Sequence, residues 1–184
     1  YTTGMFHVMT HAFFKALLFL GAGSVIHAMS GEQDMRFMGG LRKKIPVTYW
    51  TFLIGTLAIC GVPPLSGMIS KDEILVTLWD KNPLLWGLTL FSAGLTAIYM
   101  FRLLFLTFFG EFRGTEEQKK HMHESPAVMT IPLVVLAILS VVGGFINLPH
   151  FIGHGDYQKL AHWLDPIYKF DLNHPTIPFV TEMI

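Results

Sequence analysis

Four long apolar stretches divide this sequence, and they restrict the folds that it can adopt. They cover about residues 5–29, 47–79, 84–109 and 127–148. A helix needs roughly 20 predominantly apolar residues to cross a bilayer, and each stretch is at least that long. We therefore expect an all-α membrane protein, a polytopic bundle of four transmembrane helices, one of which is broken.

The composition agrees with a chain that packs in lipid. Hydrophobic residues make up 52% of the 184 positions and charged residues only 14%, whereas soluble domains carry about 25% charged residues. The formal net charge is zero and no run of five basic residues occurs, which argues against a nucleic-acid partner. The single cysteine, Cys60, lies in an apolar run, so neither a disulfide framework nor a cysteine metal site is expected.

Two polar loops, residues 30–46 and 110–126, carry most of the positive charge. They follow the first and third apolar stretches, so they lie on the same side of the membrane. Seven cations lie in these loops against three on the other side, and loops rich in Lys and Arg tend to face the cytoplasm. The seven are Arg36, Arg42, Lys43, Lys44, Arg113, Lys119 and Lys120. We expect residues 149–184 on the periplasmic or outer side, as an extramembrane or interfacial connection.

Three evenly spaced ionisable side chains lie in the first stretch. His7, His11 and Lys15 are four residues apart, and residues at that spacing share a helix face, about 6 Å apart along the axis. A charge near the middle of a membrane helix costs at least about 2.5–3.5 kcal/mol. An amine that is taken out of water holds its proton less tightly, and histidine exchanges a proton near neutral pH. The pattern favours a proton relay through the membrane interior.

Two other interpretations of this pattern stay open. A histidine in a membrane helix can bond to a neighbouring helix and serve packing alone. A His-x-x-x-His pair can also bind zinc when a third ligand lies near, and membrane histidines can hold haem. A haem- or metal-holding electron-transfer subunit is therefore a possible function of a different class, although it leaves Lys15 without a role.

The second stretch is interrupted by GVPPLSG at residues 61–67. Its prolines remove backbone donors and its glycines permit irregular dihedrals. In lipid, such a break is tolerated only within protein or beside a wet cavity, and broken helices recur at the ion sites of transporters. Lys71 and Asp72 follow the break, and we expect them to transfer protons. The alternative is a solvated helix start, with Ser70 as the cap and Glu73 completing a capping box.

Four segments resemble one known family, in the right order. They are HAFFKALLFLGAGSVIH, EQDMRFMGGL, GVPPLSGMISKDEIL and HESPAVMTIPLVVLAILSVVGGF. Together they resemble the antiporter-like subunit L of bacterial NADH:quinone oxidoreductase, respiratory complex I, over about residues 5–148. The resemblance implies the second proton-channel repeat of a longer subunit, with the broken helix in its middle. Because the chain starts at Tyr1 and not at Met, we expect a fragment of a longer protein, and the resemblance implies that it comes from the C-terminal half.

The resemblance also implies roles for individual residues. In this family a lysine in the first of these helices is the central proton carrier, and nearby histidines feed it. These roles fall on Lys15, His11 and His7. The family's terminal lysine and the neighbouring aspartate, near the exit to the periplasm, correspond to Lys71 and Asp72. No metal-binding or cofactor-binding residue is implied for this chain.

The function that the resemblance implies is proton translocation, together with the other membrane subunits of complex I and with lipid. Quinone reduction elsewhere in the complex would drive it, and FMN, the iron-sulfur clusters and quinone would lie outside this chain. The large subunit of a multisubunit cation/proton antiporter or of a membrane-bound hydrogenase has the same fold and stays open as an alternative. We expect multi-pass insertion in the bacterial inner (plasma) membrane.

Overall fold

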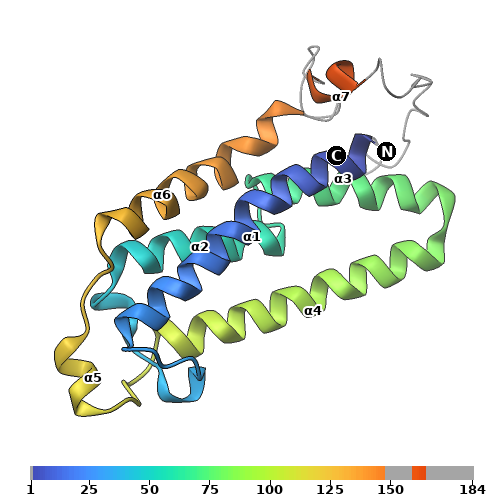
Figure 1. Cartoon of the computed structure of the whole chain (residues 1–184). Coiled ribbons are helices and arrows are strands. Elements are labelled where there is room, and N and C mark those ends of the chain that lie inside the picture. The colour runs from blue at the N-terminus through green and yellow to red at the C-terminus, as the bar shows by residue number, and fades with distance from the viewer. Residues whose placement is uncertain (1, 148–158, 165–184) are drawn as a thin grey trace.

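A computed structural model describes residues 2–147 and 159–164, and its elements are all helices (Figure 1). The α-helices of this part are α1 (Thr2–Ala28), α2 (Pro46–Cys60), α3 (Ser66–Lys81), α4 (Pro83–Phe108), α5 (Glu116–His121), α6 (Ala127–Val142) and α7 (Lys159–Leu164). The 3-10 helices are η1 (Met35–Phe37), η2 (Leu41–Lys43) and η3 (Gly143–Ile146). The predicted all-α class is confirmed.

Three of the described helices are long and apolar enough to cross a bilayer, namely α1, α4 and α6 with its extension η3. The second predicted span is occupied by α2 and α3, which have 15 and 16 residues. Each is therefore only about 23 Å long, shorter than a hydrocarbon core of about 30 Å. The two half-helices follow one another along the bundle (Figure 1). The bilayer limits of the spans stay a prediction, and of residues 149–184 only α7 is described.

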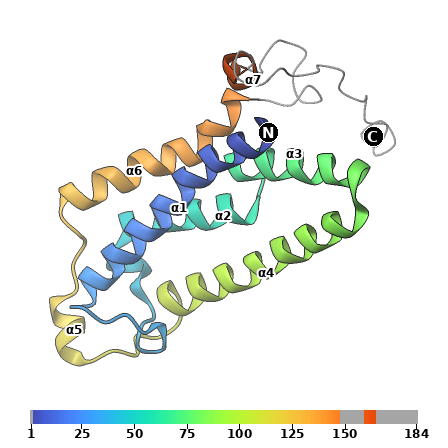
Figure 2. The same ribbon diagram turned by 45° about the vertical axis from the view of Figure 1, so that its right-hand side comes forward.

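The central helix of the bundle is α1. It packs against α2, α3 and α6, and against α7 near its start. Figures 1 and 2 show α6 and α4 on opposite sides of the α1–α2 pair. The largest buried cluster joins three helices and includes Phe14 and Leu18 of α1, Phe52 of α2 and Phe108 of α4. Because lipid is itself apolar, such contacts stabilise a membrane bundle through van der Waals packing rather than through exclusion of water.

Small residues bring α1 and α2 close together. A Cβ atom at Gly21 would lie 2.8 Å from Cδ2 of Phe52, and one at Gly55 would lie 3.0 Å from Cγ of Leu18. Membrane helices often approach one another through small positions of this kind. The close contact fixes the register of α2 on α1, and with it the point on α1 that the end of α2 reaches.

At the edge of the bundle, α4 exposes most of its apolar surface. It starts at Pro83, a position where a missing N–H is harmless, and Asn82 caps it by accepting from the N–H groups of Leu84 and Leu85. The buried residues of α4 lie in its last three turns and are Met100, Leu104, Thr107 and Phe108. In a membrane protein, such an exposed apolar face lies against lipid or against a further helix.

The two polar loops meet at one end of the bundle, opposite the start of α1 (Figure 1). Gly40 in the first loop donates its N–H to the carbonyl of Phe109. The guanidinium of Arg113 in the second loop donates to three carbonyls, those of Met35, Arg36 and Leu106. The loops therefore lie on the same side, and their assignment to the cytoplasm stays a prediction.

Candidate functional site

The predicted relay residues of α1 meet α3 just beyond the helix break. Ser70 is fully buried, its Oγ lies 3.0 Å from Nδ1 of His7, and it accepts a hydrogen bond of 2.8 Å from the Thr10 hydroxyl. Further along the same interface, the Thr3 hydroxyl donates to Oε1 of Glu73 at 3.2 Å. We call these five residues, Thr3, His7 and Thr10 of α1 with Ser70 and Glu73 of α3, the polar seam.

Lys71 connects the two half-helices. Its ammonium group donates a hydrogen bond to the carbonyl of Ile59, in the last turn of α2. The last carbonyls of a helix lack partners within the helix, and the negative end of the helix macrodipole favours a cation there. Because Lys71 directly follows Ser70 in α3, the helix break and the polar seam form one continuous site.

Two glycines shape the break in different ways. Gly61 has a φ of 79° and ends α2 in the left-handed conformation, with its N–H bonded to the carbonyl of Ala58. Gly67 lies inside α3, and a Cβ atom there would lie 1.9 Å from the carbonyl oxygen of Ala58. The expectation of irregular dihedrals is wrong for Gly67, because this glycine instead permits the close approach of α3 to the end of α2.

The alternative of a solvated helix start at Ser70 is also wrong. The helix begins at Ser66, and its N-cap is Leu65, which makes no side-chain cap bond. Ser70 therefore lies in the second turn of α3, inside the bundle. Glu73 does not complete a capping box, because its carboxylate accepts from Thr3 of α1. Its other oxygen, Oε2, is buried and has no hydrogen-bond partner among the described residues.

His11 and Asp72 lie beside the polar seam, and both are half-buried. The His11 ring lies 5.9 Å from the ring of His7 and 5.3 Å from that of Phe14. Lys71 is close enough to interact electrostatically with both histidines and with Asp72. The structure therefore brings four of the five predicted relay residues together around the break.

Lys15 is near enough to His11 to interact with it electrostatically, but it differs from the other four residues in its exposure. It is the middle residue of α1, but its side chain is exposed on the surface of the described bundle. The expectation that this lysine is buried is wrong within this part of the chain. Lys15 shares a face of α1 with the exposed Val8 and Phe19, whereas the neighbouring Phe14 and Leu18 face the packed helices.

A second polar cluster lies at the loop end of α1. The Ser24 hydroxyl lies 2.7 Å from the hydroxyls of Thr48 and of Ser125. Glu124 accepts from the Thr48 hydroxyl at 2.6 Å and from the backbone N–H of Val47 at 2.7 Å. Its carboxylate thus satisfies the free N–H groups at the start of α2. We call Ser24, Thr48, Glu124 and Ser125 the loop-end cluster.

Sequence reasoning missed two of the seam residues and the whole loop-end cluster. Thr3 and Thr10 share a helix face with His7, so their spacing was an available signal. The members of the loop-end cluster come from the end of α1, the start of α2 and the segment before α6. No spacing rule connects such distant segments, so only the packed structure reveals that cluster.

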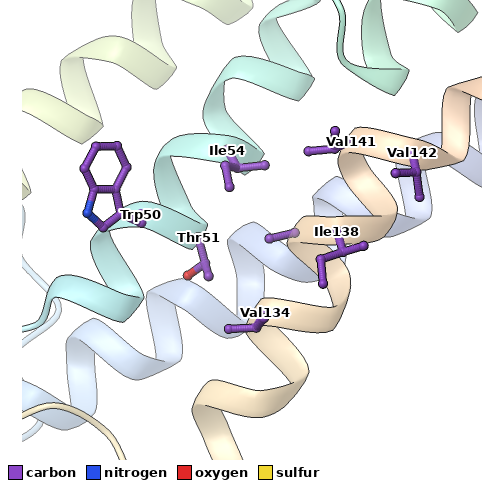
Figure 3. A pocket seen from close by; sticks show the side chains of 8 residues that line it. Trp50, Thr51, Ile54, Val134, Ile138, Val141 and Val142 are labelled. Atoms are coloured by element: carbon purple, nitrogen blue, oxygen red, sulfur yellow. The ribbon is translucent and has the colours of Figure 1, made fainter.

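An apolar groove lies between α2 and α6, away from the ionisable residues of the seam (Figure 3). Trp50 and Ile54 of α2 and Val134 and Ile138 of α6 are among the side chains that line it. Its polar side chain, Thr51, donates its hydroxyl to a carbonyl of its own helix.

The haem or metal interpretation gains no support from the geometry. Within residues 2–147 and 159–164, no three His, Cys, Asp or Glu side chains come together in a group that could hold a metal ion. Nδ1 of His7 is in contact with a hydroxyl rather than with a further ligand. The described residues therefore offer no third ligand to the pair formed by His7 and His11.

Comparisons with known proteins point to one family. A family model described as "NADH:quinone oxidoreductase/Mrp antiporter, TM" matches residues 1–96. The NAD(P)H-quinone oxidoreductase chain 5 of Picosynechococcus is 52% identical, over 81% of this chain and 26% of that protein. The NADH-quinone oxidoreductase subunit L of Rhodobacter capsulatus is 50% identical, over 83% of this chain and 23% of that protein. This chain thus spans about a quarter of the length of the curated relatives it matches.

A solved structure of similar fold comes from the membrane-bound sulfane sulfur reductase (MBS), an archaeal respiratory membrane complex. The TM-score is 0.72 at 24% sequence identity, over 96% of this chain and 34% of that chain. At this identity the match concerns the fold alone. The resemblance to subunit L that the sequence motifs predict is confirmed by the family model and by the curated relatives.

Proposed function

We propose that this chain, which belongs to the NADH:quinone oxidoreductase/Mrp antiporter transmembrane family, carries protons within an antiporter-like subunit of NADH:quinone oxidoreductase. As a member of this family it is part of a multi-pass membrane protein. Because it spans about a quarter of the related subunits, the proposal concerns its share of a larger assembly. The residues that we assign to proton transfer are Lys15, His11, His7, Lys71 and Asp72.

The observation that supports this function best is the convergence of ionisable residues from two helices on the break. His7 contacts Ser70, and the adjacent Lys71 bonds to the C-terminal end of α2 through the Ile59 carbonyl. The Lys71 ammonium is hydrogen-bonded to a neutral carbonyl, and Asp72 lies near enough to interact with it electrostatically. The ammonium releases its proton more readily when the environment becomes more positive, for example when a histidine nearby is protonated.

The exposed position of Lys15 fits a relay that is completed by protein outside the described residues. A charged amine that faces lipid near the middle of a helix costs at least about 2.5–3.5 kcal/mol. Charged residues in membrane segments therefore usually face protein or a wet cavity. We propose that the face of α1 with Lys15 receives protons from a neighbouring surface and passes them through His11 and His7 towards Lys71 and Asp72.

The proposal also covers the surroundings of the chain. The other membrane subunits of the complex and lipid are its partners, and quinone reduction takes place elsewhere in the assembly. FMN, iron-sulfur clusters and quinone accordingly belong to other parts of the complex. We place the end of the bundle with the two polar loops in the cytoplasm of the bacterial inner membrane, because those loops hold most of the cations.

The test uses the full-length protein in its native membrane assembly, reconstituted in vesicles. Replacement of Lys15 or Lys71 by Ala should lower NADH-driven proton transport, per NADH oxidised, by about tenfold or more. The matched control is Lys81→Ala, because Lys81 is exposed at the end of α3, and it should transport protons like the parent protein. Undiminished transport in both the Lys15 and the Lys71 variant would rule out the relay.

The same assay separates the proposed complex from its relatives in the family. NADH:quinone reductase activity that is coupled to proton transport supports the proposal. An assembly without that activity that exchanges sodium for protons, or that evolves hydrogen, contradicts the assignment to complex I and identifies an antiporter or a hydrogenase instead.

A further inference from the structure

We propose that Ser70 is a positioning residue that allows His7 to change its protonation state inside the bundle, an inference that rests on the proposed proton relay. Ser70 is fully buried in α3, and its Oγ is the meeting point of two side chains of α1. Nδ1 of His7 lies 3.0 Å away and Oγ1 of Thr10 lies 2.8 Å away. Ser70 is thus the side chain of α3 that forms a hydrogen bond with the His7 ring.

The hydrogen-bond donors and acceptors of His7, Thr10 and Ser70 permit two arrangements. A hydroxyl has one proton to donate and two lone pairs that accept. When His7 is neutral with its proton on Nε2, Thr10 donates to Ser70 and Ser70 donates to Nδ1. When His7 is protonated on both nitrogens, Nδ1 donates and Ser70 must accept. The Ser70 proton then turns to another acceptor, such as the carbonyl four residues earlier in the helix.

Thr10 has the freedom that the second arrangement requires. Its hydroxyl lies 2.8 Å from Oγ of Ser70 and 3.1 Å from the backbone carbonyl of His7. It can therefore keep a hydrogen bond while Ser70 accepts from the histidine. Neither arrangement leaves a buried donor of His7, Thr10 or Ser70 unpaired, and an unpaired one costs about 1–3 kcal/mol.

Ser66 shows that a buried serine of α3 does not automatically bond to the histidine. It lies one turn before Ser70 in α3 and is also fully buried. Its hydroxyl, however, has no hydrogen-bond partner among the described residues. The two serines match in residue type, helix and burial, and they differ in contact with His7. Ser66 is therefore the control for Ser70.

The experiment measures NADH-driven proton transport of the full-length assembly in vesicles, per NADH oxidised, across the titration range of histidine. Ser70→Ala leaves the protonated Nδ1 without an acceptor. It should lower transport by about tenfold, the factor for one hydrogen bond to a charged group. The pH of half-maximal transport should move down, because more acid is then needed to protonate His7. Ser66→Ala should match the parent, and Ser70→Thr, which keeps the hydroxyl, should restore the parental pH profile.

Thr10→Val is the second variant, and it decides the question if Ser70→Ala fails to assemble. It removes the donor to Ser70 at nearly constant volume, so it weakens only the arrangement with neutral His7. The pH of half-maximal transport should then move up, opposite to the shift of Ser70→Ala. The titratable groups of the described residues that interact with His7 are His11 and Lys71, and Glu73 lies further along the same interface of α1 and α3. They are unchanged in every variant, so they cannot produce shifts of opposite sign.

Each remaining outcome overturns the inference. A parental pH profile in Ser70→Ala, or in Thr10→Val when that variant decides, means that the junction does not position His7. Equal losses in Ser70→Ala and Ser66→Ala without a shift in pH mean that both serines only fill space. The Lys15→Ala variant separates the two proposals. If both it and Lys71→Ala transport normally, the relay itself fails; if either of them loses transport while Ser70→Ala is parental, only the role of Ser70 fails.

Discussion

The bundle contains two polar clusters of similar composition, one at each half of α1, and they differ in how completely their hydrogen bonds are satisfied. The loop-end cluster joins three hydroxyls to the carboxylate of Glu124, and both oxygens of that carboxylate accept hydrogen bonds. The polar seam joins three hydroxyls to His7 and to the carboxylate of Glu73. One oxygen of Glu73, Oε2, is buried without a partner among the described residues.

The unsatisfied groups around the polar seam extend beyond Glu73. The hydroxyls of Thr2 and Ser66 are also buried without partners among the described residues, and Lys15 is a charged group exposed in the middle of α1. Buried polar groups are bonded in the great majority of cases. Several buried polar groups without hydrogen-bond partners therefore indicate a region where water, protons or a further protein surface supplies the missing partners.

The comparison indicates that the same residue types can form either a cluster that stabilises helix packing or a site for proton transfer. In the loop-end cluster every donor has an acceptor, so no group is left to take up a further proton. The bonds join α1, the start of α2 and the segment before α6. In the polar seam, the Glu73 carboxylate keeps a spare acceptor, and the two helices of the seam also carry His7 and Lys71. Changes to the first should therefore affect stability, and changes to the second should affect transport.

The largest effect on stability should come from Gly67→Ala, at the contact between the two half-helices. The new Cβ atom would lie 1.9 Å from the carbonyl oxygen of Ala58, and a backbone atom cannot turn aside as a flexible side chain can. Overpacking of a well-packed site typically costs about 1–3 kcal/mol, and we expect the upper end or more. The measurement is the thermal stability and yield of the assembled complex, together with its proton transport.

Gly94→Ala is the matched control for that substitution. Gly94 also lies inside a helix, α4, but a Cβ atom there meets nothing within 4 Å. Alanine is a better helix former than glycine by about 1 kcal/mol, so this variant should be as stable as the parent or slightly more stable. Equal stability of the two variants would contradict the close contact of α3 with the end of α2.

The next effect in size should come from Glu124→Ala, in the loop-end cluster. The change removes the acceptor of the Thr48 hydroxyl and of the Val47 N–H. Hydrogen bonds to a charged group contribute about 1.5–3 kcal/mol, so the assembled protein should lose about 2 kcal/mol of stability. Thermal unfolding of the complex checks this, and proton transport per NADH oxidised should stay unchanged in the protein that assembles.

Glu116→Ala provides the comparison for Glu124. Glu116 forms an exposed ion pair with Lys119 at 3.5 Å, and exposed pairs contribute about 0–1 kcal/mol. Its replacement should change neither stability nor transport by a measurable amount. A loss of transport in Glu124→Ala at normal stability would contradict the distinction between the two clusters, because it would give the loop end a part in the relay.

Much of the fold follows from patterns in the sequence. Long, predominantly apolar stretches predict the helices α1 and α4, and the double proline with its glycines predicts the break after α2. The four-residue spacing of His7, His11 and Lys15 also predicts correctly that they follow one side of a helix. These inferences work because lipid and helix periodicity act on local sequence.

The orientation of α1 in the bundle could not be predicted in the same way. In a soluble protein the apolar stripe identifies the buried face, but a membrane helix is apolar on all sides. The sequence therefore contains no signal that Lys15 is exposed while Phe14, next to it, is buried. The start of α3 at Ser66 depends on the close approach at Gly67, which is a tertiary contact that no local pattern encodes.

The smallest effect should come from His123→Gln, which compares two pairs of histidines. The rings of His27 and His123 at the loop end lie 5.8 Å apart, almost the same distance as the 5.9 Å between His7 and His11. His27 and His123 are exposed, however, whereas His7 and His11 are half-buried beside the break. If ring spacing alone made a relay, both pairs would carry protons, and His123→Gln would impair transport as much as His7→Gln.

The contacts of His7 predict a different result. His7 bonds to a buried serine of another helix, and Lys71 lies close to it. Nδ1 of His123 contacts the carbonyl of His121, two residues away in the same loop. Glutamine at position 123 should therefore leave proton transport per NADH oxidised within error of the parent value, while His7→Gln lowers it by about tenfold. Equal losses in the two variants would show that the loop end belongs to the proton route, and that satisfied hydrogen bonds do not exclude transfer.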